Sequence, residues 1–98
     1  MSGSDSDTMR QTASFEIINR LGLHARAAAL LAETANRFEA EVRVTRDAQT
    51  VNAKSVMDLM LLAASCGSMV EVTAVGADAH LALYAIGELI ARRFHEKD

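Results

Sequence analysis

Residues 13–38, ASFEIINRLGLHARAAALLAETANRF, decide the fold, because the spacing of the apolar residues changes once within them. Ala13, Phe15 and Ile17 alternate with polar residues, which is the period of a half-buried strand. From about residue 24 to residue 37 the apolar residues instead recur every three or four positions, which predicts an amphipathic helix. The buried stripe of this helix is expected to consist of Ala28, Leu31, Ala32, Ala35 and Phe38.

Three further strands are expected downstream of this helix. Apolar residues at every second position predict strands over residues 40–44 and 70–74. A short strand is expected around residues 50–52, because Asp47 and Ala48 suit a turn that leads into it.

Two further helices complete the pattern. The sequence predicts a short helix over residues 55–65, with Gly67 placed to end it in a left-handed conformation. Asp78 suits the N-cap of a last helix, whose buried stripe comprises Ala79, Ala82, Leu83, Ile86, Leu89 and Ile90. The order β-α-β-β-α-β-α predicts an α+β fold, a two-layer sandwich with four strands on one side and three helices on the other.

The 98 residues are enough for one domain. Residues 1–11, MSGSDSDTMRQ, lack a periodic apolar pattern, and we interpret them as a disordered leader before a domain over residues 12–98. Met1 and Met9 are alternative translation starts.

Composition excludes several classes of protein. The net charge of −3 and an aromatic content of 4% argue against a nucleic-acid-binding domain. Cys66 is the only cysteine, which excludes an internal disulfide, and we expect its thiol to be buried. No apolar run approaches the roughly 20 residues of a membrane span, and no signal peptide pattern is present. We therefore expect a cytoplasmic protein without a cofactor or metal, and a monomer.

His24 is the residue with the clearest chemical potential. It lies between a glycine-containing loop and an Ala-rich helix, where unpaired backbone N–H groups bind anions such as phosphate. A neutral imidazole there would be a nucleophile near pH 7, and Arg26 is close enough to contact phosphoryl oxygens. On the residues alone, a structural helix cap remains the alternative. His80 and His95 lack partners at metal-ligand spacing, and we expect no chemistry from either.

A second informative stretch begins at Ser55. Asp58 follows three residues later, which matches a helix-capping box, and a phosphate on Ser55 would also be stabilised by the helix dipole. Apolar residues follow in this short helix, which cannot easily bury all of them on one face. We therefore expect some of them to form an exposed docking patch, with core packing as the alternative. They are Val56, Met57 and Met60.

At these two stretches the sequence resembles HPr, the histidine-containing phosphocarrier family of the bacterial phosphoenolpyruvate-dependent phosphotransferase system. Gly22-Leu23-His24-Ala25-Arg26 is similar to its phosphohistidine motif, and Asn52-Ala53-Lys54-Ser55-Val56-Met57 is similar to its regulatory serine motif. The resemblance covers about residues 12–92. It implies an open-faced sandwich in which three helices cover one side of a four-stranded antiparallel sheet.

The resemblance also implies a function. Enzyme I, charged by phosphoenolpyruvate, would place a phosphoryl group on a ring nitrogen of His24, where Arg26 would hold its oxygens. His24 would pass the group to an enzyme IIA of a sugar-transport or regulatory branch, so the protein would be a stoichiometric carrier rather than an enzyme. Ser55 would be the target of HPr kinase/phosphorylase. The partner-docking surface of the family is matched by Val56, Met57 and Met60.

Two residues depart from the family pattern. Ala27 stands where the family usually has proline, which adds back a backbone N–H at the start of the helix. Asp58 stands where the regulatory motif commonly has glycine, and its charge would repel a phosphate on Ser55. Phosphorylation of Ser55 therefore stays open, as do the enzyme IIA partner and the choice between the sugar and nitrogen branches.

The main alternative is a regulatory module that binds partners through Ser55 and the Val56–Met60 surface without phosphotransfer. Replacing His24 with alanine distinguishes the two hypotheses, because only the carrier needs a nucleophile. A nucleic-acid-binding α+β domain of similar strand order is disfavoured by the net negative charge.

Overall fold

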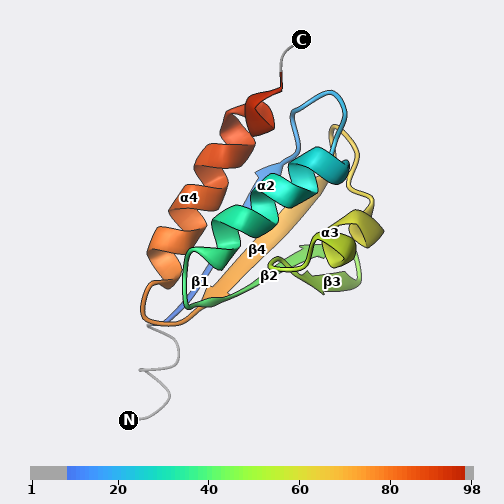
Figure 1. Cartoon of the computed structure of the whole chain (residues 1–98). Coiled ribbons are helices and arrows are strands. Elements are labelled where there is room, and N and C mark those ends of the chain that lie inside the picture. The colour runs from blue at the N-terminus through green and yellow to red at the C-terminus, as the bar shows by residue number, and fades with distance from the viewer. Residues whose placement is uncertain (1–8, 97–98) are drawn as a thin grey trace.

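A computed structural model describes residues 9–96 as a four-stranded antiparallel sheet with three helices on one face (Figure 1). The strands lie side by side in the order β1-β4-β2-β3, and their bounds are β1 Arg10–Glu16, β2 Glu41–Arg46, β3 Gln49–Asn52 and β4 Met69–Val75. The helices are α2 Ala25–Asn36, α3 Val56–Leu62 and α4 Ala79–Ala91, followed by the 3₁₀ turn η1 Arg93–His95. The predicted fold class and element order are confirmed.

The core lies between the sheet and the helices, because one residue in two along each inner strand faces inward. Val42, Val44 and Val72 are fully buried on that side, whereas the residues of the opposite side are mostly polar and exposed. The predicted stripe of α2 is buried except for Phe38, which is half-buried, and its small alanines suit close packing against the neighbouring helices α3 and α4. The stripe of α4 is likewise buried, apart from a partly buried Leu83.

Helix α3 is shorter than predicted. It ends at Leu62 because Ala63 adopts a left-handed conformation, with φ 53° and ψ 38°, and donates its N–H to the carbonyl of Met60. Gly67, predicted to end this helix, also has a positive φ of 94°, but it lies in the following turn. There its N–H donates to the carbonyl of Ile17 at 2.7 Å, so Gly67 connects the turn to the end of β1.

Asp78 occupies the predicted N-cap position of α4 but does not cap that helix. Its carboxylate instead accepts the backbone N–H groups of Glu39 at 2.9 Å and Ala40 at 2.8 Å, across the loop before β2. These bonds, with the one from Glu39 as the largest cause, hold the pKa of Asp78 below its ordinary value. The carboxylate therefore joins two loops instead of stabilising one helix end.

Three smaller predictions can also be compared with the structure. Strand β1 begins at Arg10, so Arg10 and Gln11 belong to the sheet and not to a leader that extends to residue 11. The rest of the predicted leader, residues 1–8, lies outside the described residues. The Cys66 side chain is exposed, so the prediction of a buried thiol was wrong. None of the helices between residues 9 and 96 has both the length and the apolar character to cross a membrane.

Candidate functional site

The loop between β1 and α2 carries the site, and backbone contacts hold it against residues 63–68. The N–H of Leu23 donates to the carbonyl of Ala64 at 2.8 Å. Gly22 has a φ of +69°, and a Cβ at this position would lie 2.7 Å from the Ala64 oxygen and 2.9 Å from Cα of Ser65. Only glycine combines this conformation with such a close approach, so Gly22 sets the path of the chain into α2.

His24 is the N-cap of α2, so it lies at the N-terminal end of the helix, as the sequence predicted. Its backbone is extended, and its ring nitrogen Nδ1 accepts the N–H of Arg26 at 3.3 Å. The first turn of α2 contains no acidic side chain, so the positive end of the helix is not neutralised from within. The imidazole therefore lies at a helix end suited to an anion, with 29% of its side chain exposed.

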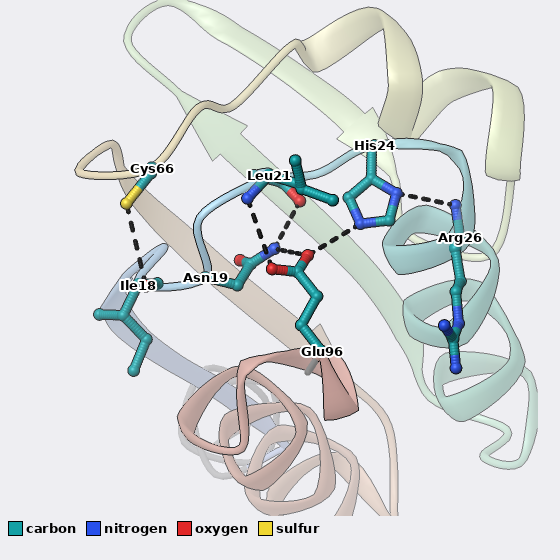
Figure 2. A network of polar contacts seen from close by, with 8 residues as sticks. Ile18, Asn19, Leu21, His24, Arg26, Cys66 and Glu96 are labelled. Atoms are coloured by element: carbon teal, nitrogen blue, oxygen red, sulfur yellow. Dashed lines mark hydrogen bonds and ion pairs between the residues drawn. The ribbon is translucent and has the colours of Figure 1, made fainter. Parts of the chain in front are cut away.

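The second ring nitrogen of His24 contacts Glu96, from the far end of the chain (Figure 2). The distance between Nε2 and Oε2 of Glu96 is 2.9 Å. The same oxygen accepts the amide of Asn19 at 2.7 Å, while the N–H of Leu21 reaches Oε1 at 3.4 Å. The hydrogen bond from Asn19, then those from His24 and Leu21, hold the pKa of Glu96 below its ordinary value, so it is ionised at neutral pH.

This network assigns the tautomer of His24. An ionised carboxylate can only accept hydrogen bonds, so Nε2 must carry a proton toward Glu96. In the neutral ring the lone pair then lies on Nδ1, which accordingly accepts the N–H of Arg26. The ring nitrogen with the lone pair is therefore the one at the N-terminus of α2.

An irregular C-terminal segment brings Glu96 to this site. After α4, the residues Arg93, Phe94 and His95 have φ values of 58°, 55° and 60°. The side chain of Phe94 is only 2% exposed and packs in the core, which fixes this left-handed turn. Sequence reasoning missed Glu96 because the last residues resemble a charged tail. The one available signal was Phe94, a large apolar residue among charged ones.

Arg26 reaches His24 through its backbone and not through its side chain. Its backbone N–H contacts His24, but in Figure 2 its side chain extends along α2 away from the imidazole. Within residues 9–96 the guanidinium has no hydrogen bond or ion pair, so it is free to rotate toward a ligand. An open cavity of about 370 Å³ lies between these groups, lined by Leu21, His24, Arg26, Phe94, His95 and Glu96. His95, from which we expected no chemistry, thus lines the same cavity.

Ser55 is the N-cap of α3, as predicted. Its Oγ accepts the N–H of Asp58 at 3.2 Å. The reciprocal half of the predicted capping box is not formed, because the N–H of Ser55 donates to the carbonyl of Asn52. Ser55 therefore has a structural role in the unmodified protein and lies about one helical turn from the Asp58 carboxylate.

The predicted docking residues are exposed rather than packed in the core. Exposure is 37% for Val56, 77% for Met57 and 46% for Met60, and the sequence analysis missed Leu61, which is 69% exposed. We call these four residues the α3 patch. The end of α3 lies beside the start of α2 in Figure 1. Together with the bond between Leu23 and Ala64, this places the C-terminal end of α3 beside the loop that carries His24.

Comparisons with known proteins agree with this arrangement. A family model described as "PTS HPr component phosphorylation site" matches residues 11–92. The chain is 48% identical over 83 residues to the phosphocarrier protein HPr of Neisseria meningitidis serogroup A, covering 85% of this chain and 93% of the relative. It is 44% identical over 81 residues to HPr of Treponema pallidum, covering 83% of this chain and 92% of that protein.

A solved structure gives the same answer for the fold. The crystal structure of HPr from Thermoanaerobacter tengcongensis superimposes with a TM-score of 0.86 at 41% sequence identity, covering 90% of this chain and 99% of that one. The family match extends across both stretches that carry the resemblance, around His24 and around Ser55. The chain therefore belongs to the HPr family of phosphocarrier proteins of the phosphotransferase system.

Proposed function

We propose that His24 is the phosphoryl acceptor and that Nδ1 is the reacting nitrogen. The observation that carries this proposal is the orientation of the ring, with Nδ1 at the N-terminus of α2 and Nε2 held by Glu96. Enzyme I, charged by phosphoenolpyruvate, is the donor. An enzyme IIA is the acceptor that takes the group onward. Both reactions take place in the cytoplasm, where phosphoenolpyruvate is available.

Transfer needs little from this chain beyond position and charge. The lone pair of Nδ1 attacks the phosphorus as the phosphorus–nitrogen bond of the donor histidine breaks. The N–H of Arg26 is only 3.3 Å from Nδ1 and turns to the incoming phosphoryl oxygens together with the other free N–H groups of the first turn. The unpaired guanidinium of Arg26 then rotates toward the same oxygens and offsets their charge.

The chain acts as a stoichiometric carrier rather than as an enzyme with its own substrate. Its histidine is reached from the surface, because 29% of the side chain is exposed beside an open cavity. The α3 patch supplies the apolar contact that a short-lived protein complex needs, with flexible methionines that suit more than one partner. Enzyme I and enzyme IIA would therefore use the same surface in turn.

Regulation at Ser55 is a separate part of this proposal. A phosphate added there by HPr kinase/phosphorylase would lie at the start of α3, next to the α3 patch, and would disturb docking by enzyme I. Asp58 opposes that modification, because its carboxylate follows in the first turn of the same helix. Relatives of the nitrogen-related branch lack kinase control, and this chain would resemble them if Ser55 stays unmodified.

Phosphorylation by enzyme I tests the carrier role directly. The purified protein is incubated with enzyme I, Mg²⁺ and phosphoenolpyruvate, and its intact mass is measured before and after acid treatment. We expect one acid-labile phosphoryl group, which is lost in His24→Ala and kept in the control variant His80→Ala, whose histidine is exposed on α4. Subsequent addition of an enzyme IIA should remove the group.

A regulatory module without phosphotransfer would give a different result. The wild type would gain no mass, and His24→Ala would bind its partners as well as the wild type.

The variant Arg26→Gln distinguishes the role of the Arg26 backbone N–H from the role of its charge, since it keeps the N–H but removes the guanidinium. We expect this variant to be phosphorylated at the same residue but more slowly.

A further inference from the structure

We propose that Glu96 is a positioning residue for phosphoryl transfer: its carboxylate holds the Nε2 proton of His24, so that Nδ1 remains the reacting nitrogen throughout the cycle. This inference rests on the proposed function. It assigns a role to the irregular segment after α4 that brings Glu96 to His24.

The contact between His24 and Glu96 belongs to a network of hydrogen bonds. The side chain of Glu96 is only 10% exposed, and each of its oxygens accepts at least one hydrogen bond. Asn19, which is completely buried, donates both to Oε2 of Glu96 and to the carbonyl of Gly22, each at 2.7 Å. The same amide therefore fixes the carboxylate and the loop that leads to His24.

The backbone after α4 shows that this position of Glu96 is enforced. Arg93, Phe94 and His95 all adopt left-handed conformations, which are uncommon for residues other than glycine. The buried ring of Phe94 anchors the turn in the core. The hydrogen bonds of Glu96 lie directly after this anchor, so packing of Phe94 directs the carboxylate to His24.

The chemistry of transfer gives the carboxylate two roles. Before transfer, the hydrogen bond to Glu96 favours the tautomer with a proton on Nε2 and a lone pair on Nδ1. When Nδ1 forms its bond to phosphorus, the electron pair of the broken donor bond returns to the donor ring. The His24 ring keeps its Nε2 proton and becomes cationic, beside the Glu96 carboxylate. A carboxylate that orients an imidazole and stabilises its cation is an established arrangement in catalysis.

Onward transfer reverses these steps without moving the proton. The acceptor nitrogen bonds to phosphorus, the electron pair returns to Nδ1, and the ring is neutral again in the same tautomer. Without Glu96 the neutral ring would also populate the tautomer with its proton on Nδ1. In that tautomer Nδ1 has no lone pair with which to attack phosphorus.

The test compares Glu96→Gln with the control variant Glu88→Gln. Glutamine keeps the size of residue 96 and one accepting oxygen, but removes the charge. Glu88 is an exposed carboxylate on α4 whose partner is Arg92 at 3.6 Å, so the control makes the same change of charge away from His24. Urea denaturation of both variants establishes that they are folded under the conditions of the assay.

Two readouts are measured on these proteins. ¹⁵N NMR of the imidazole, at a pH at which the ring is neutral, reports the tautomer of His24. We expect the Nε2–H form in the wild type and in Glu88→Gln, and a mixture of both tautomers in Glu96→Gln. The initial rate of phosphorylation by enzyme I should fall about tenfold to a hundredfold in Glu96→Gln, the range typical of lost positioning. It should be unchanged in Glu88→Gln, and Glu96→Asp should restore part of it.

The possible results are distinct. A folded Glu96→Gln with the wild-type tautomer, or with the wild-type rate, would overturn the inference and leave His24 as the carrier residue. Absence of phosphorylation in the wild type would instead overturn the proposed function and the inference together. A slower rate joined to a changed tautomer supports the positioning role, since a merely structural tail would not alter the tautomer of a folded protein.

Discussion

Substitution of Gly22 by alanine perturbs the point where the His24 loop meets residues 63–68. The new methyl group would lie 2.7 Å from the carbonyl oxygen of Ala64 and 2.9 Å from Cα of Ser65. Both neighbours are backbone atoms, so neither can rotate away as the end of a side chain would. The loop must move, and the hydrogen bond from Leu23 to Ala64 must lengthen with it.

The cost of Gly22→Ala has three parts. A left-handed conformation costs an alanine about 1–2 kcal/mol relative to glycine. Overpacking against rigid neighbours adds about 1–3 kcal/mol. Reduced freedom of the unfolded chain returns about 0.4–1 kcal/mol. We therefore expect the free energy of unfolding to fall by about 1–5 kcal/mol, out of the 5–15 kcal/mol that is typical of small proteins.

Gly67→Ala is the matched control for this prediction. Gly67 also has a positive φ, of +94°, but a Cβ there would meet no atom within 4 Å. The difference between the two variants in urea denaturation therefore isolates the steric clash, and we expect Gly22→Ala to be less stable by about 1–3 kcal/mol. If the Gly22→Ala variant is folded, it should also accept the phosphoryl group from enzyme I more slowly than the wild type. Equal stabilities, within about 0.5 kcal/mol, would show that the close approach at Gly22 does not destabilise the alanine variant.

Three other predictions follow from the structure. Asp78→Asn should lower stability at pH 7, because Asp78 has a lowered pKa in the folded state and stabilises the protein only while ionised. The deficit should shrink as the pH falls through the folded-state pKa of Asp78, and urea denaturation across the acid range measures it. Met57→Glu should weaken binding of enzyme I about tenfold in calorimetry, or about 1.4 kcal/mol, without a loss of stability. The control variant Leu81→Glu, at an exposed site on α4, should leave binding of enzyme I unchanged. Asp58→Asn should speed phosphorylation of Ser55 by HPr kinase/phosphorylase, detected as an acid-stable added mass; an unchanged rate would exclude charge repulsion as the barrier.

The predictable features of this fold depend on local sequence patterns. The change of period between Ile17 and Ala28 predicted a strand followed by a helix, because burial of one face selects that spacing directly. The same pattern placed His24 at the start of α2. The exposure of Met57 was predictable too, since a helix as short as α3 has only one face toward the core.

The features that were missed depend on contacts between distant segments. Glu96 lies 72 residues after His24 along the chain, and nothing in the local pattern of charges shows that they meet. Asp78 satisfies the local rule for an N-cap, but the N–H groups of Glu39 and Ala40 compete for its carboxylate. Ala63 ends α3 in a conformation that its residue type disfavours. For Asp78, hydrogen bonds to a distant loop override the local preference.

The proposed function depends above all on transfer of the phosphoryl group to Nδ1 of His24. The most direct measurement is ³¹P and ¹⁵N NMR of the ¹⁵N-labelled protein after incubation with enzyme I, Mg²⁺ and phosphoenolpyruvate. Our prediction is a single phosphohistidine with phosphorus coupled to Nδ1 of His24, and a proton retained on Nε2 beside Glu96. A phosphoryl group on Nε2, on His80 or His95, or on no histidine would contradict it.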